Sequence, residues 1–385
     1  MARAPVLDDA APPPEADRIE GAPHPRVTRR LFGQARAEDA FLQAARAGRL
    51  HHAWLLTGPR GVGKATLAWR IARALLTDTA PDDGLFGAPE PQGLALRDPG
   101  DDPLSRRLAQ LAEPRLHLTR RPWDDKAGRH RQDITVDEIR KLKSFFQMTA
   151  ADGGRRVAIV DAADDLNTPA ANALLKLLEE PPPGAVLLLI AHQPAGLLPT
   201  IRSRCRTLRL AALAPDDIAQ ALADAGADAD VAARHALPLA ALSGGSVGEA
   251  MRLINLDGLA SYGALIDLAA SLPRLDRAAA LSFAESHAQR GAEARLALAH
   301  DLIDLMLARL ARCGLGLPPD PAATPDEAAI LTRLCPDATA ARIWAEAQIR
   351  IGARLRHGRA VNLDAASALL DAFLDMAATA GSLPA

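Results

Sequence analysis

Short apolar segments alternate with amphipathic segments through the first half of the chain. The apolar segments have the length of buried strands, and apolar residues in the intervening segments recur at helical spacing. The predicted strands are Leu55–Thr57, Leu116–Thr119, Arg156–Asp161, Ala185–Ala191 and Arg206–Leu210. Strands that alternate with helices are typical of a parallel sheet with helices on both faces. We therefore predict a doubly wound α/β domain over residues 26–210.

The second half of the chain has helical spacing only. One apolar stripe in this half consists of Leu302, Leu305, Met306 and Leu310. Arg309 is the only polar residue that interrupts this stripe. Spacing of this kind is typical of helices packed in a bundle. We predict a small helical lid domain over residues 211–256 and a helical bundle over residues 257–385.

Two segments of the chain show neither pattern. Residues 1–25 are rich in proline, alanine and acidic residues, a composition that predicts a disordered leader. Residues 77–103 are rich in proline, glycine and aspartate, which favours a surface insertion in the α/β domain over core structure.

Composition narrows the class of protein further. The chain has 385 residues, of which 49% are hydrophobic and 24% charged, as expected for a globular protein with a buried core. A net charge of −2 argues against a protein that coats nucleic acid through its overall field. The longest apolar run, Ala185–Ala191, is too short to span a membrane. Three widely spaced cysteines favour a reducing compartment, so we expect a cytoplasmic protein with no membrane contact.

A glycine-rich loop follows the first predicted strand. Gly58, Gly61, Gly63 and Lys64 have the spacing of a Walker A phosphate loop, whose backbone N–H groups and lysine hold phosphate groups. The next residue in that pattern is Ser or Thr, whose hydroxyl binds Mg²⁺. This chain has Ala65 there, and Thr66 lies one helical step, about 100°, out of place. The loop is therefore expected to suit phosphate better than the metal.

An acidic residue at the end of a later strand completes the candidate nucleotide site. Asp161 ends the third predicted strand, in the manner of a Walker B aspartate that orients the Mg²⁺ shell. An ATPase of this kind next needs a glutamate that polarises water, and this chain has Ala162. Asp164 and Asp165 lie further along, but we do not expect them to replace that glutamate.

Two later motifs carry a resemblance to a known family. The segment 173–182 reads Ala-Leu-Leu-Lys-Leu-Leu-Glu-Glu-Pro-Pro, and Ser203-Arg204-Cys205 follows it. In this order after the Walker B strand, the motifs resemble the clamp-loader branch of the AAA+ proteins. Over nearly the whole chain, except the leader and the insertion, the sequence is similar to delta-prime subunits of bacterial DNA polymerase III.

The resemblance implies a role in DNA replication. Delta-prime subunits are stators in a ring with gamma/tau and delta, which places the sliding clamp on primed DNA. By this resemblance, Arg204 is an arginine finger that reaches the ATP of the neighbouring gamma/tau subunit, and residues 257–385 form the oligomerisation collar. The chain is then a component of the polymerase holoenzyme that itself has neither polymerase nor ATPase activity.

Departures from the motor subunits of that family fit such a role. Ala65 removes the Mg²⁺ hydroxyl and Ala162 the catalytic carboxylate, and Gly248 stands where a motor subunit has its second-sensor arginine. We expect no required cofactor and leave ATP or ADP binding open. The chain also lacks the cysteine cluster with which many clamp-loader subunits bind zinc, so we expect no metal site.

Two other functions remain as alternatives. The first is an active AAA+ ATPase, either a gamma/tau-like motor or a remodelling chaperone, against which Ala65, Ala162 and Gly248 count. The second is a simple DNA-binding module, which the near-neutral charge disfavours. Phe145 and Phe146 lie where a clamp-opening subunit presents an apolar wedge, but core packing is the favoured interpretation.

Overall fold

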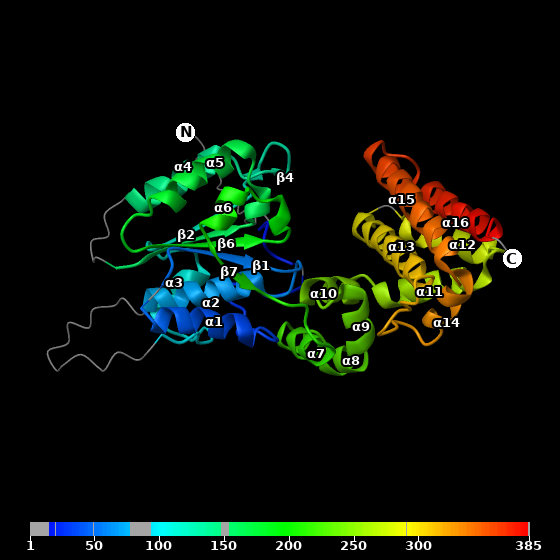
Figure 1. Cartoon of the computed structure of the whole chain (residues 1–385), viewed down its shortest axis with the longest axis horizontal. Helices are drawn as coiled ribbons and strands as arrows, with labels where there is room; N and C mark the ends of the chain where they lie inside the picture. Colours follow the sequence, from blue (N-terminus) through cyan, green and yellow to red (C-terminus); the bar gives the residue numbers. More distant parts are fainter. Residues whose placement is uncertain are drawn as a thin grey trace, which may run out of the picture. The chain divides into compact units, whose positions relative to one another are not determined.

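A computed structural model describes residues 15–19, 21–48, 50–77, 94–147, 154–289 and 291–383. The chain divides into two compact units, Met1–Ala212 and Leu213–Ala385, which are considered separately below (Figure 1).

A five-stranded parallel sheet forms the centre of the first unit, with the strand order β2-β5-β6-β1-β7. The strands are β1 (Ala53–Thr57), β2 (Leu116–Arg120), β5 (Arg156–Asp161), β6 (Ala185–Ala191) and β7 (Arg206–Arg209). All pairs are parallel, and β1 lies between β6 and β7. The carboxyl ends of the strands therefore meet at one edge of the sheet. The predicted doubly wound parallel sheet is confirmed.

Helices cover both faces of this sheet (Figure 1). One face carries α1 (Ala35–Arg46), α2 (Lys64–Thr77) and α3 (Pro103–Ala109), and the other carries α4 (Val136–Gln147), α5 (Thr168–Glu179) and α6 (Pro199–Ser203). Two 3₁₀ turns, η1 (Ala163–Asp165) and η2 (Pro194–Gly196), follow β5 and β6. A two-stranded hairpin of β3 (Trp123–Asp124) and β4 (Arg129–His130) was not predicted.

Alternate residues of the central strands pack on opposite faces of the sheet. Leu55 of β1 and Leu187 of β6 join the core beneath α4 and α5. On the other face, the ring of Trp54 meets Phe41 of α1 edge-on, with the ring centroids 5.0 Å apart. Such two-sided burial explains why the strands read as continuous apolar runs.

Phe145 and Phe146 belong to the core on the α4 side of the sheet. The ring of Phe145 stacks on His117 of β2, with the centroids 5.3 Å apart. The predicted core packing of these two residues is confirmed.

Part of the predicted leader is ordered, which corrects the expectation of disorder over residues 1–25. Residues 15–19 and 21–25 pack against the α/β unit, whereas residues 1–14 and 20 lie outside the described residues. His24 is buried, and its ring meets Trp69 of α2 edge-on. Charged residues in the segment form ion pairs with the α/β unit. A prediction of disorder from composition does not take such pairs into account.

The predicted insertion is also anchored at its C-terminal end. Leu96 and Asp98 both accept hydrogen bonds from the guanidinium of Arg70 on α2. Residues 78–93 of the insertion lie outside the described residues.

The second unit is helical throughout its described residues, as predicted. Its helices are α7 (Pro215–Asp224), α8 (Ala229–Arg234), α9 (Ala236–Ser243), α10 (Val247–Asn255), α11 (Gly258–Ser271), α12 (Arg277–His287), α13 (Glu293–Cys313), α14 (Glu327–Leu334), α15 (Ala338–Ala360) and α16 (Ala365–Gly381).

A buried polar network explains the single polar residue in the apolar stripe of α13. Glu327 is fully buried, and its Oε1 accepts hydrogen bonds from the hydroxyl of Tyr262 at 2.6 Å and from Arg309 at 2.7 Å. Arg309 also donates to the carbonyl of Ala241 on α9 at 2.8 Å. The arginine thus links α9, in the predicted lid, to α13 and α14 in the predicted bundle. The boundary between those two domains stays a prediction.

Candidate functional site

The glycine loop connects β1 to α2 at the carboxyl edge of the sheet. Gly58, Gly61 and Gly63 have positive φ angles of 143°, 76° and 98°. A Cβ at Gly58 would lie 2.4 Å from the carbonyl oxygen of Leu210, so a larger residue does not fit there. Glycines with positive φ angles are typical of phosphate loops, in which successive N–H groups turn toward an anion.

Lys64 does not extend toward an open phosphate site. Its Nζ donates to the carbonyl of Gly58 at 2.7 Å and to the carbonyl of Pro59, and the residue is only 3% exposed. Burial lowers the pKa of Lys64 to about 8, although Asp161 and Asp164 favour its charged form. A bound phosphate must therefore compete with the two carbonyl groups of the loop itself.

The metal side of the site is poorly suited to Mg²⁺. Burial and the neighbouring Asp17 raise the pKa of Asp161 to about 7, although Lys64 opposes the shift. Ala65 and Ala162 offer no ligand atom in their side chains, and Thr66 is buried on α2. The residues present fit a phosphate group, but they do not fit a catalytic metal ion.

The two acids that follow Asp161 are engaged within the fold. The carboxylate of Asp164 accepts from the backbone N–H of His192 and, at 3.1 Å, from that of Gln193. Asp165 pairs with Arg121 at 3.2 Å. Neither acid is placed as a free base for a water molecule. Burial together with the charges of Lys64 and Arg60 lowers the pKa of His192 to about 4, so its ring is neutral near pH 7.

Arg204 follows α6 as its C-cap residue, in a different environment. Its Nη1 donates to the carbonyl of Thr200 at 3.1 Å, and its Nη2 pairs with Oε1 of Glu179 at 2.9 Å. The side chains of Arg204 and Glu179 are 37% and 48% exposed. An exposed ion pair of this kind contributes about 0–1 kcal/mol, so a stronger anion can displace Glu179.

The sequence did not predict a set of charges at the β2 end of the same edge. Arg120, the last residue of β2, pairs with Asp17 and, at 3.1 Å, with Glu15. Arg120 stands opposite Asp161 in the register of β2 and β5. The partners lie about a hundred residues apart in the chain, and no motif spacing connects them.

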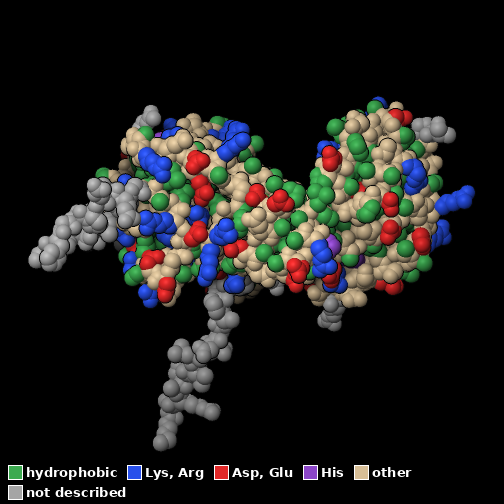
Figure 2. All heavy atoms as spheres, turned by 90° about the horizontal axis from the view of Figure 1, so that it is seen from below, with side chains coloured by type: hydrophobic (Ala, Val, Ile, Leu, Met, Phe, Trp, Pro, Cys, Tyr) green, Lys and Arg blue, Asp and Glu red, His purple; other side chains and the backbone are tan. Residues whose placement is uncertain are grey.

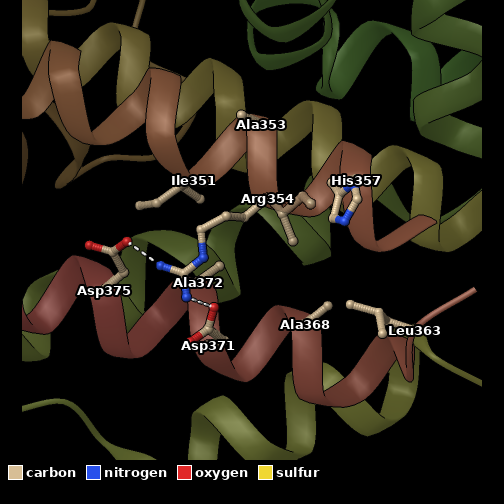
Figure 3. A pocket seen from close by; sticks show the side chains of 10 residues that line it. Ile351, Ala353, Arg354, His357, Leu363, Ala368, Asp371, Ala372 and Asp375 are labelled. Atoms are coloured by element: carbon tan, nitrogen blue, oxygen red, sulfur yellow. Dashed lines mark hydrogen bonds and ion pairs between the residues drawn. The ribbon is translucent and has the colours of Figure 1, made fainter. Parts of the chain in front are cut away.

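A groove of about 450 Å³ lies between α15 and α16 in the second unit (Figure 3). Arg354 bridges Asp371 and Asp375 across it, and the rest of the lining is mostly apolar. Its two acids are paired with Arg354, and His357 also belongs to the lining.

Neither a metal cluster nor a membrane-spanning single helix is evident in the described part of the chain. Among the described residues, no group of three or more His, Cys, Asp or Glu is placed to hold a metal ion. In the same part of the chain, no single helix is long and apolar enough to cross a membrane. The pair α10 and α11 reaches that length and composition jointly but is bent by 80°.

Comparisons with known proteins show which proteins this chain is similar to. The model of a family described as DNA polymerase III, delta subunit, matches residues 33–214. The DNA polymerase III subunit delta-prime of Pseudomonas aeruginosa is 40% identical over 206 residues, which cover 52% of this chain and 55% of that protein. Over about half of its length, the chain is similar to DNA polymerase III delta-prime subunits. This similarity agrees with the resemblance identified from the sequence motifs.

Relatives of other kinds are more distant. DNA polymerase III subunit tau of Escherichia coli is 30% identical over 284 residues, covering 72% of this chain and 40% of tau. The chain thus spans 55% and 40% of the lengths of these two relatives. Among solved structures, the Holliday junction branch migration motor RuvB of Thermotoga maritima matches with a TM-score of 0.35 and 17% identity, over 58% of this chain and 60% of RuvB.

Proposed function

We propose that this protein is the delta-prime subunit of a DNA polymerase III clamp loader, in which it binds gamma/tau and delta and hydrolyses no ATP itself. In the assembled ring, Arg204 extends to the ATP held by the adjacent gamma/tau subunit. The ring then loads the sliding clamp onto primed DNA.

The observation that carries the proposal is the contrast between the protein's own nucleotide edge and Arg204. At the nucleotide edge, Lys64 is hydrogen-bonded to its own loop, and Asp164 and Asp165 have partners within the fold. Arg204 is exposed at the end of a short helix and held by one exposed carboxylate.

The chemistry of a finger fits this placement. A guanidinium stabilises the charge that develops on a transferred phosphoryl group, and fingers of this kind contribute about 10³–10⁵ in rate. Displacement of Glu179 by a triphosphate exchanges an exposed ion pair for a contact that a subunit interface shields from water.

An active ATPase is the second candidate function, favoured by the intact glycine loop and Lys64. Ala65, Ala162 and Gly248, the last on α10, count against turnover at this site. A DNA-binding module is not favoured, because acidic and basic side chains are interspersed on the face seen in Figure 2.

The proposal is tested by Arg204→Ala in a complex assembled with gamma/tau and delta. ATP hydrolysis at the facing gamma/tau site should fall about 10³-fold, because the transition state loses its cation. Single-turnover hydrolysis with the clamp and primed DNA measures this loss, and gel filtration checks assembly. Arg202→Ala, an exposed arginine on the same helix, is the matched control and should leave the rate unchanged.

Two outcomes contradict the proposal. The first is a complex with Arg204→Ala that assembles and hydrolyses ATP at the normal rate. The second is failure of the chain to co-elute with gamma/tau and delta.

A further inference from the structure

The N-terminal segment of residues 15–19 and 21–26 contacts α2 and the end of α3. At one end, Arg26 donates to the carbonyl of Ala109 at 2.8 Å, and its own carbonyl accepts from Arg73 of α2 at 3.0 Å. Two residues before Arg26, His24 packs on Trp69 of the same helix. At least one residue thus fixes the segment on each of two helices, α2 and the end of α3.

Glu15 pairs with Arg26 at 2.6 Å, so the two ends of the segment meet. Both Glu15 and Asp17 contact Arg120 at the carboxyl edge of the sheet. Asp17 pairs with Arg120 and, at 3.1 Å, with Nε2 of His24, and its side chain is only 3% exposed. Because Arg120 is the register partner of Asp161, the ion pair of Asp17 lies beside that acid. The charge of Asp17 helps to raise the pKa of Asp161, so the two carboxylates interact.

The negative charge of Asp17 disfavours a nucleotide at this edge of the sheet. In a working site, the acid at Asp161 faces a metal ion that is bound to phosphate oxygens. Here a second carboxylate adds negative charge beside it, and the guanidinium of Arg120 is occupied by Asp17 and Glu15. A metal-bound triphosphate meets repulsion from Asp17 and finds Arg120 unavailable.

We propose that residues 15–19 and 21–26 form a cover over the nucleotide edge, in which Asp17 competes with the phosphate groups of a nucleotide. The inference builds on the proposed function, in which this site is silent, and adds that part of its low affinity comes from the chain's own N-terminal segment. With the cover in place in most molecules, apparent affinity falls in proportion to the fraction that is open.

The affinity of the full chain for a nucleotide tests the proposed cover directly. Asp17→Asn keeps the size of the side chain and removes its charge, which weakens the hold of Arg120 on the segment. Affinity for ATP with Mg²⁺ should rise at least about fivefold, the lower end of ordinary coupling between sites. Calorimetric titration with ATP and Mg²⁺ measures this change, and thermal unfolding checks that the variant is folded.

Glu113→Gln is the matched control for Asp17→Asn. Glu113 is a buried acid that pairs with Arg107 at 2.8 Å and with Arg115 at 2.9 Å, near the opposite end of β2. Its loss should lower stability in a comparable way and leave nucleotide affinity unchanged. A rise in affinity for both variants would overturn the proposal, since it would reflect loosening of the domain.

A second variant guards against failure of Asp17→Asn to fold. Glu15→Gln removes a less buried partner of Arg120 and should raise affinity in the same direction by a smaller factor. Unchanged or weaker binding in the folded variants overturns the cover. That failure is distinct from failure of the proposed function, because it leaves the effect of Arg204→Ala on the assembled complex unaltered.

Discussion

Two regions of the α/β unit hold their cations in opposite ways. At the glycine loop, Lys64 is 3% exposed and donates to two carbonyl groups of its own loop. After α6, Arg204 is 37% exposed and pairs with one exposed acid. The first cation is part of the fold, whereas the second is available to a partner at small cost.

The acids of the two regions differ in the same sense. Around the loop, Asp164 binds two backbone N–H groups and Asp165 binds Arg121, so their loss disturbs the local fold. Glu179, by contrast, is 48% exposed and pairs with Arg204. The comparison teaches that the charged groups at the loop serve the local fold, whereas those after α6 remain accessible to a partner.

Two substitutions test this comparison through the free energy of unfolding. Asp161→Asn should give the larger effect. Because burial raises the pKa of Asp161 to about 7, the native state favours its protonated form. The stability from this proton is complete below the unfolded pKa, near 4, and is lost as pH rises through about 7. The asparagine variant lacks this loss, so it should gain about 1–3 kcal/mol relative to the parent between pH 5 and pH 8.

Urea unfolding of both proteins at the two pH values measures this gain. Asp137→Asn is the control, since Asp137 lies on α4 with 69% of its side chain exposed. An identical gain in stability in both variants would contradict the view that burial disfavours the ionised form of Asp161.

Glu179→Ala should give the smaller effect. Loss of an exposed ion pair changes the free energy of unfolding by about 0.5 kcal/mol or less. In the assembled clamp loader, ATP hydrolysis should persist, because Arg204 needs no internal partner to reach a triphosphate. Chemical denaturation and the ATPase rate measure the two effects, with Glu180→Ala as the neighbouring exposed control. A loss of hydrolysis as large as that of Arg204→Ala would show that the pair itself is required.

The sequence predicted the sheet and the two edges of the candidate site for physical reasons. Strands buried on both faces appear as continuous apolar runs, and the carboxyl ends of parallel strands share one edge. Lys64, after β1, and Asp161, at the end of β5, were therefore expected at the same edge, where the structure places them.

Other features of the site depend on contacts that spacing does not encode. Asp17 and Arg120 are 103 residues apart, and the acidic composition around Asp17 suggested disorder. The hydrogen bonds of Lys64 to its own loop depend on side-chain conformation, which the Walker A spacing leaves open. The hairpin of β3 and β4 has strands of only two residues each, too short for a pattern of alternation.

The most direct test of the account is steady-state ATP hydrolysis by the purified chain alone, with Mg²⁺ present. We expect no turnover above background. The site lacks the side-chain hydroxyl that binds Mg²⁺ and the catalytic carboxylate, and Lys64 is hydrogen-bonded to its own loop. The Lys64→Ala variant should therefore show the same background rate of ATP hydrolysis as the parent protein. Turnover by the parent that Lys64→Ala abolishes would contradict the account, because the nucleotide edge would then be an active site.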